Sequence, residues 1–198
     1  MPPGDILIHA GDFTRFGNLD DAVDFNLWLG ELYEYTDKLI VLGNHECNAS
    51  WKADAKTILT NATVLVHESV EIDGIRIFGS QFFWPAKGPN PYLDAIPTDT
   101  AILIAHGPVQ GFVDAGKGCS ALRHKVLGLP SLRLVVCGHI HRARGIEKPR
   151  EDRASWVTSW LSWLIAGCNP TSAAFVNAAN VVDDARGLEP PISASMTP

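Results

Sequence analysis

The chain has 198 residues, 46% of them hydrophobic and 19% charged, an ordinary globular composition that can bury one substantial core. Its 16 lysines and arginines against 22 aspartates and glutamates give a net charge of −6, which argues against nucleic acid or an anionic membrane as main partner. No basic region followed by an apolar stretch opens the chain, and the apolar segment 156–166 is shorter than the about 20 residues of a membrane span. We therefore expect a soluble, cytoplasmic protein.

Four short apolar runs predict buried strands, because continuous apolar runs bounded by turn residues suit strands covered on both faces. Each run stops abruptly in a polar loop that contains glycine. The four runs are Ile6 to Ile8, Leu39 to Leu42, Ile102 to Ile104 and Leu134 to Val136.

Helical segments alternate with these strands. Leu19 to Tyr35 predicts an amphipathic helix with Asn18 as its cap, and shorter helices are expected at Trp51 to Leu59 and Cys119 to Leu127. Asp73-Gly74 marks a two-residue hairpin within Val64 to Gly79. The order predicts an α/β fold whose sheets gain antiparallel elements.

Beyond Gly145 the pattern weakens. One more strand is expected at Ala174 to Ala178, within a single domain of residues 1–182 that is followed by a disordered tail, 183–198. Residues 146–172 read as an atypical insertion with three tryptophans at roughly helical spacing. It is interpreted as a surface helix, with a mistranslated insertion or a substrate lid as alternatives.

The cysteines predict free thiols. They are widely spaced and form no C-x-x-C pair, so neither a zinc knuckle nor a disulfide framework is indicated. The four are Cys47, Cys119, Cys137 and Cys168.

Chemistry is concentrated in the four loops that follow the strands. In an open α/β sheet the loops beyond the carboxyl ends of the strands converge on one crevice. Oxygen and imidazole donors suit Mn, Fe, Zn, Ni or Mg rather than a thiolate site. The loops supply Asp12, Asn44, His45, His106, His139 and His141.

Each of these residues alone has a plainer explanation, since a single histidine is more often a surface or core residue than a ligand. Four strand-end loops in succession favour a metal site, because turns do not need imidazoles. Elsewhere, Phe82 and Phe83 could line the crevice or pack in the core, and Asp114 could sit near its rim. His67 and His124 are expected on the surface.

The loop series resembles the signature of the calcineurin-like metallophosphoesterase superfamily in order and spacing. It reads Gly11-Asp12, Gly43-Asn44-His45-Glu46, His106-Gly107 and Gly138-His139-Ile140-His141. The sequence flanking these motifs is similar to that of the branch of metallophosphoesterase-domain-containing proteins related to the brain 239 protein. The resemblance implies an α-β-β-α sandwich with mixed sheets, and hydrolysis of a phosphodiester such as a cyclic nucleotide.

The resemblance also implies roles for the loop residues. Asp12 would bridge two divalent metal ions, with His141 on the first. The second metal would take Asn44, His106 and His139. His45 would act as general acid on the leaving oxygen. Two such metals can clamp both oxygens of an in-line displacement and lower the pKa of a shared water.

One part of the family pattern is missing. No Asp-x-His motif, which would complete the first metal site, occurs in the chain, and only eleven residues precede Asp12. His9 could substitute, but a core or supporting hydrogen bond is the preferred reading. We expect an incomplete chain that lacks the first strand, with a true variant as the alternative.

Two further functions stay open. The alternative to an enzyme is a catalytically impaired metal- and nucleotide-binding protein with one well-bound metal, and a purely structural domain would hold no metal. The expected partner is a small phosphoester such as a nucleotide.

Overall fold

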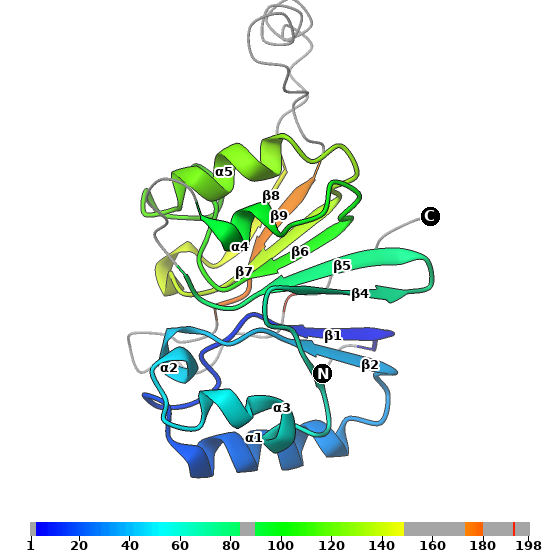
Figure 1. Ribbon diagram of the computed structural model, residues 1–198, viewed down its shortest axis with the longest axis vertical. Coiled ribbons are helices and arrows are strands. Elements are labelled where there is room, and N and C mark those ends of the chain that lie inside the picture. Colours follow the sequence, from blue (N-terminus) through cyan, green and yellow to red (C-terminus); the bar gives the residue numbers. More distant parts are fainter. Residues whose placement is uncertain (1–2, 84–89, 149–172, 180–191, 193–198) are drawn as a thin grey trace, which may run out of the picture.

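Two β-sheets lie face to face between two layers of helices in the computed structural model, which describes residues 3–83, 90–148, 173–179 and 192 (Figure 1). The smaller sheet has the strand order β1-β2-β3, and the larger has the order β4-β5-β6-β7-β9-β8. Helices α1, α2 and α3 cover the outer face of the smaller sheet, while α4 and α5 cover that of the larger one. The predicted α-β-β-α sandwich is confirmed.

The smaller sheet is entirely parallel. Its strands are β1 (Ile6–His9), β2 (Asp37–Ile40) and β3 (Thr63–Val64). Among the described strands β1 pairs with β2, and all four of its residues are half buried, so full burial was a wrong prediction for this strand.

The larger sheet is mixed, with a parallel centre and an antiparallel strand at each edge. Its parallel strands are β5 (Ile75–Ser80), β6 (Ile102–Ala105), β7 (Leu134–Cys137) and β9 (Ala174–Asn177). The edges are β4 (Glu68–Ile72) and β8 (Gly145–Glu147). The hairpin prediction is confirmed, because Asp73 and Gly74 both have positive φ, 50° and 75°, at the β4–β5 turn.

The helices are shorter than the sequence pattern suggests. Asn18 caps α1 as predicted by accepting from two backbone N–H groups, but the helix ends at Glu31 instead of continuing to Tyr35. Gly30 lowers the helix propensity of its last turn. The complete set is α1 (Leu19–Glu31), α2 (Asn44–Cys47), α3 (Ala55–Ile58), α4 (Pro91–Asp94) and α5 (Ser120–Leu127), with 3-10 turns at Lys52–Asp54 and His141–Ala143.

Side-chain alternation along the central strands builds the core on both faces of the larger sheet. On β6, Ile102 and Ile104 face the smaller sheet, whereas Leu103 faces the helices. Each fully buried aliphatic side chain contributes about 1.5–3 kcal/mol of transfer free energy. The two sheets are therefore held at a fixed separation, and the loops at their strand ends inherit that geometry.

Several predictions lie partly or wholly outside the described residues. The tail 183–198 is outside except for Ile192, which packs on the core between the sheets. The insertion 146–172 is outside beyond residue 148. Cys47, Cys119 and Cys137 are free thiols as predicted, and Cys168 is outside. Among the described helices, none is long and apolar enough to cross a membrane.

Candidate metal centre

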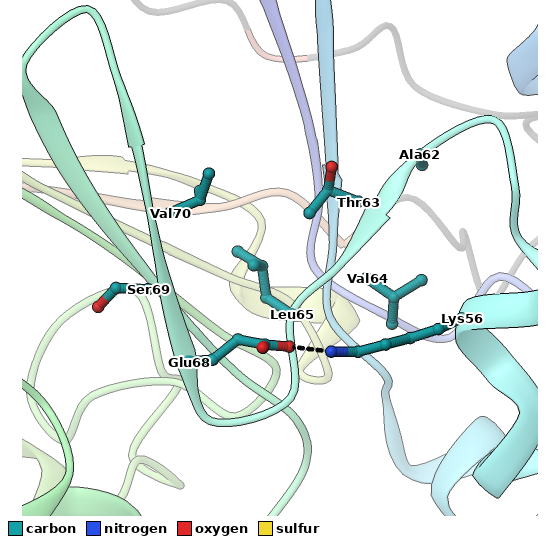
Figure 2. Close-up of a pocket in the computed structure, with 8 residues that line it drawn as sticks. All are labelled: Lys56, Ala62, Thr63, Val64, Leu65, Glu68, Ser69 and Val70. Carbon is teal, nitrogen blue, oxygen red and sulfur yellow. Dashed lines mark hydrogen bonds and ion pairs between the residues drawn. The ribbon is translucent and has the colours of Figure 1, made fainter.

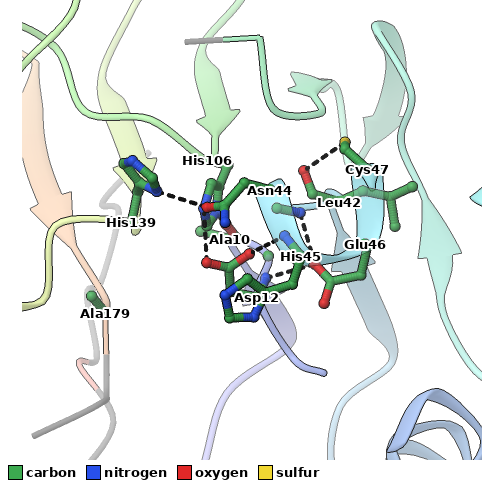
Figure 3. Close-up of polar contacts among 12 residues, drawn as sticks. Ala10, Asp12, Leu42, Asn44, His45, Glu46, Cys47, His106, His139 and Ala179 are labelled. Carbon is green, nitrogen blue, oxygen red and sulfur yellow. Dashed lines mark hydrogen bonds and ion pairs between the residues drawn. The ribbon is translucent and has the colours of Figure 1, made fainter. Parts of the chain in front are cut away.

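The loops after four parallel strands meet at one edge of the sandwich (Figure 3). Asp12 follows β1 and Asn44 follows β2, whereas His106 and His139 follow β6 and β7. The predicted convergence of these four side chains is confirmed. Their roles as metal ligands are not tested by the geometry alone and remain predictions.

Short contacts join the ligand atoms of the four side chains in a chain from Asp12 through His106 and Asn44 to His139. His106 Nε2 is 3.2 Å from Asp12 Oδ2 and 3.1 Å from Asn44 Oδ1. Asn44 Oδ1 is also 2.8 Å from His139 Nδ1. Among the described residues, one group of three or more His, Cys, Asp or Glu side chains has ligand atoms that all lie within 4.8 Å of one another. This group consists of Asp12, His106 and His139.

The hydrogen bonds around His106 show that this group suits a cation. His106 Nδ1 lies 2.6 Å from the carbonyl oxygen of Ala10, which can only accept, so this nitrogen carries the proton. In the neutral ring, Nε2 then directs a lone pair at the oxygens of Asp12 and Asn44. A divalent cation between these atoms replaces mutual repulsion with coordination, and the carbonyl partner holds the ring in the correct tautomer.

Two further groups have the protonation states that metal binding requires. Burial and the nearby His106 lower the pKa of His139 to about 4, so its imidazole is neutral at pH 7. Burial opposes ionisation of Asp12, but contact with His106 in its protonated form and the hydrogen bond from the His45 backbone outweigh burial and lower the pKa of Asp12.

His45 lies beside the group of Asp12, His106 and His139, and its ring Nδ1 faces the carbonyl oxygen of Thr14. Its backbone N–H donates to Asp12 Oδ1 at 3.0 Å, and its ring Nδ1 lies 2.7 Å from the carbonyl oxygen of Thr14. That oxygen can only accept, so Nδ1 carries a proton and Nε2 is the atom that can exchange one. This arrangement is compatible with the predicted general acid.

His141 begins the 3-10 turn that follows β7 and is half buried. It does not belong to the group of Asp12, His106 and His139, although it is close enough to lower the pKa of His139. Its predicted place on a different, first metal is therefore neither supported nor contradicted.

Comparison with known proteins gives this arrangement a family. The family model for calcineurin-like phosphoesterases matches residues 2–143. The chain belongs to the calcineurin-like phosphoesterase family. Metallophosphoesterase domain-containing protein 1 of Homo sapiens is 34% identical, over 74% of this chain and 57% of that protein. A UPF0046 protein of Caenorhabditis elegans is also 34% identical, over 74% of this chain and 59% of its own length.

The chain thus spans a little under three fifths of the length of these relatives. Among solved structures, TT1561 of Thermus thermophilus has a TM-score of 0.55 and 12% identity, covering 88% of this chain and 76% of its own. At that identity the likeness shows a shared fold alone.

In this calcineurin-like chain, His9 does not belong to the group of Asp12, His106 and His139. Its ring Nδ1 accepts the backbone N–H of Gly11 at 3.2 Å, and the ring packs edge-on against Phe13 and Phe25. Burial, followed by the charge of His106, lowers its pKa to about 4. The preferred reading of a core residue with a supporting hydrogen bond agrees with these contacts.

Glu46 is a positioning residue that sequence reasoning quoted without assigning a role. Its carboxylate is fully buried and accepts from the backbone N–H groups of Asp12, Thr14 and Gly43 at 2.8, 3.0 and 2.9 Å. It also accepts from the Thr14 hydroxyl at 2.7 Å. One side chain therefore joins the loop that carries Asp12 to the loop that carries Asn44.

The two loops approach so closely that glycine is required on both sides. A Cβ on Gly11, where φ is +92°, would overlap the backbone of Gly43, and a Cβ on Gly43 would overlap Asp12 Oδ1. Any side chain at either position would separate Asp12 from Asn44.

Asn177 at the carboxyl end of β9 was missed by sequence reasoning. It is fully buried, and its amide nitrogen donates to the carbonyl oxygens of Val113 at 3.0 Å and Ile140 at 3.1 Å. It therefore holds the loop between His139 and His141 against the loop around Asp114. No sequence motif identifies such a residue, because the atoms that it binds belong to the backbone of residues far away in the sequence.

Asp114 acts within its own loop, accepting from the backbone N–H groups of Gly111, Gly116 and Gly118 at 2.9 to 3.0 Å.

Phe82 lines the centre, with its ring 5.5 Å from that of His106 and 5.2 Å from that of His139.

The remaining histidines divide. His124 is exposed as predicted, whereas the surface prediction for His67 was wrong. His67 is half buried, lies 2.8 Å from Ser80 Oγ and stacks on Tyr92. Phe83 packs near it on the helix-covered core of the larger sheet rather than in the centre.

A separate cavity of about 290 Å³ lies between β3 and β4 (Figure 2). Its lining includes the ion pair of Lys56 and Glu68, and apolar side chains such as Leu65 and Val70. None of the predicted ligands or His45 lines it. The cavity is thus distinct from the candidate metal centre.

Proposed function

We propose that the chain hydrolyses a phosphoester with the help of divalent cations held at the strand-end loops. The observation that carries this proposal is the meeting of Asp12 Oδ2, Asn44 Oδ1, His106 Nε2 and His139 Nδ1 at one point. His141 would contribute to the other cation, the first metal of the family pattern. Family membership supports the reaction class, and the resemblance noted in the sequence supports a phosphodiester such as a cyclic nucleotide as substrate.

The chain's own residues set up the chemistry. Divalent cations, when bound, would polarise the phosphoryl oxygens and activate the attacking water; Mn, Fe, Zn, Ni and Mg all suit the donor set. Asp12 supplies the negative charge that holds them, and its pKa is low enough for ionisation at neutral pH. The amide oxygen of Asn44 adds a ligand without adding charge, which leaves the centre attractive to a phosphate.

His45 would protonate the leaving oxygen. The Thr14 carbonyl and the hydrogen bond from the His45 backbone to Asp12 orient this ring, so Nε2 is the atom that gives up the proton. Since Asn44 and His45 are adjacent, the proton donor and a ligand occupy one short helix, α2, and keep a constant separation.

The decisive experiment is turnover of bis(4-nitrophenyl) phosphate by purified protein with each of the five metals. His45→Ala should lower kcat by about 10²- to 10⁴-fold, the usual contribution of a general acid, while Mn²⁺ affinity persists. The matched control is His124→Ala, which changes an exposed histidine on α5 and should leave kcat unaltered. Absence of turnover with every metal would rule out the enzyme.

The same experiment separates the alternatives from the sequence. A catalytically impaired binding protein would bind Mn²⁺ and a nucleotide without releasing product, and a structural domain would bind no stoichiometric metal. We also propose, from the sequence alone, a small phosphoester rather than nucleic acid or a membrane as partner, and a cytoplasmic location.

A further inference from the structure

The loop between Asp12 and α1 displays an aromatic side chain beside the proposed general acid. Phe16 is 88% exposed, and its ring centroid lies 5.0 Å from that of His45, with 39° between the ring planes. Its backbone has φ = 52°, in the left-handed region that glycine or asparagine would occupy more readily. Neither burial nor backbone preference explains a phenylalanine at this position.

The residue that follows Phe16, Gly17, is fixed by two hydrogen bonds. The hydroxyl of Thr14, held by Glu46, accepts the Gly17 N–H at 3.1 Å. The indole N–H of Trp51 donates to the Gly17 carbonyl at 2.8 Å. The backbone next to Phe16 is thus held in place, and the ring projects from it into solvent.

Strain and apolar exposure together indicate a binding function. A left-handed conformation costs a non-glycine residue free energy, and such outliers persist mainly where function retains them. An exposed aromatic face gains free energy when a second planar ring stacks on it. The position of Phe16 next to His45 limits where that second ring can be attached.

We propose that Phe16 is a specificity residue that stacks on a planar aromatic or heteroaromatic ring in the leaving group of the phosphoester. This inference rests on the proposed function, because His45 protonates the leaving oxygen and the group bonded to that oxygen must therefore lie beside His45. The other aromatic residue at the centre, Phe82, contacts the rings of two proposed metal ligands, His106 and His139, and not that of His45.

A competing reading places Phe16 in a protein-docking face. Leu19, Val23 and Leu27 of α1 are 46%, 45% and 61% exposed and recur every four residues, so they form an apolar stripe that begins near Phe16. Contact with His45 and the positive φ belong to Phe16 and not to the stripe, which favours the ligand reading. The experiment below separates the two.

The test uses two phosphonates that cannot be hydrolysed and differ by one ring: benzylphosphonate and ethylphosphonate. Their dissociation constants are measured by calorimetry on the full chain loaded with Mn²⁺. Phe16→Ala should weaken benzylphosphonate by about 2- to 10-fold, the range of aromatic stacking, and leave ethylphosphonate unchanged. Phe16→Trp should restore the preference for the ring. Tyr33→Ala, which removes a ring that is 87% exposed at the far end of α1, should change neither constant.

The outcomes bear differently on the two proposals. Equal weakening of both phosphonates by Phe16→Ala, or no weakening of either, overturns the role of Phe16, and the second result favours the docking face. If the wild-type protein with Mn²⁺ binds neither phosphonate, the phosphate site itself is overturned, and the role of Phe16 with it. Ring-dependent binding without turnover of any ester would overturn hydrolysis and leave Phe16 as a residue that stacks on a bound ligand, not on a leaving group. Circular dichroism and the Tm of each variant verify that it is folded.

Discussion

The two sheets supply different halves of the candidate centre and position them in different ways. Residues of the larger sheet, His106 and His139, lie one and two residues beyond β6 and β7, so the register of neighbouring parallel strands places them. Residues of the smaller sheet, Asp12 and Asn44, lie three and four residues beyond their strands and depend on the carboxylate of Glu46.

The halves meet through the hydrogen bond between His106 Nδ1 and the Ala10 carbonyl, at 2.6 Å. A ladder of many hydrogen bonds tolerates the loss of any one side chain, whereas a loop pair joined by one buried carboxylate does not. Loss of Glu46 in the smaller-sheet loops should therefore affect folding, whereas loss of the His139 imidazole in the larger-sheet loops should affect ligand binding alone.

Removal of Glu46 is expected to have the largest effect. Glu46→Ala leaves three backbone N–H groups and one hydroxyl buried without their acceptor, each at a cost of about 1–3 kcal/mol before water or local movement relieves some of it. Urea denaturation should show the free energy of unfolding lowered by about 3–5 kcal/mol. Glu71→Ala, at an exposed site on β4, should change it by less than about 1 kcal/mol. Similar values for both variants would contradict the distinction between the sheets.

His139 tests the larger-sheet half. His139→Asn keeps a residue that accepts the observed φ of 64° but withdraws an imidazole from the ligand group. Mn²⁺ affinity, measured by calorimetry, should fall by at least about tenfold, since even residues behind the ligands cost that much. The Tm of the metal-free protein should stay close to that of wild type. A large loss of Tm would show that this loop also depends on its side chain.

His9, at the end of β1, predicts a pH dependence for the smaller-sheet half. Its folded pKa of about 4 lies below the unfolded value of 6.5, so its contribution to stability is complete above pH 6.5 and decreases as the pH falls toward 4. The slope for one proton is at most about 1.4 kcal/mol per pH unit. Urea denaturation of metal-free His9→Gln between pH 7 and pH 5 should show a shallower slope than wild type, whereas His124→Gln should match wild type. An unchanged slope in His9→Gln would show that the titration of His9 does not contribute to the pH dependence of the free energy of unfolding.

The smallest expected effect concerns the backbone of Phe16. Glycine adopts φ = 52° without strain, so Phe16→Gly should be more stable than Phe16→Ala by about 0.5–1 kcal/mol. Val23 in the middle of α1 provides the reverse control, because Val23→Gly should be less stable than Val23→Ala by about 1 kcal/mol. The same order at both positions, measured from thermal unfolding, would mean that Phe16 carries no backbone strain.

Local signals account for the parts of the fold that were predicted well. The apolar runs identified β1, β6 and β7 to within one residue, and Asp73-Gly74 identified the β4–β5 turn, because each feature depends on residues adjacent in sequence. β2 was placed about two residues late, since Val41 and Leu42 stay buried after the strand has ended. Strand β8 was missed, because its three residues pair at an edge where no continuous apolar run is needed.

For the candidate centre, the sequence by itself determined which residue types stand at the strand ends, because a strand that stops in a glycine-containing loop must present its next polar residues there. That was sufficient to name six candidates, Asp12, Asn44, His45, His106, His139 and His141, whereas only the family resemblance grouped Asp12 with Asn44, His106 and His139. Only the tertiary structure decided that Glu46 holds two loops, that Asn177 holds two others, and that Phe16 stands beside His45. These contacts join segments about 30 to 60 residues apart, and their partners are mostly backbone atoms, which leave no pattern in a sequence.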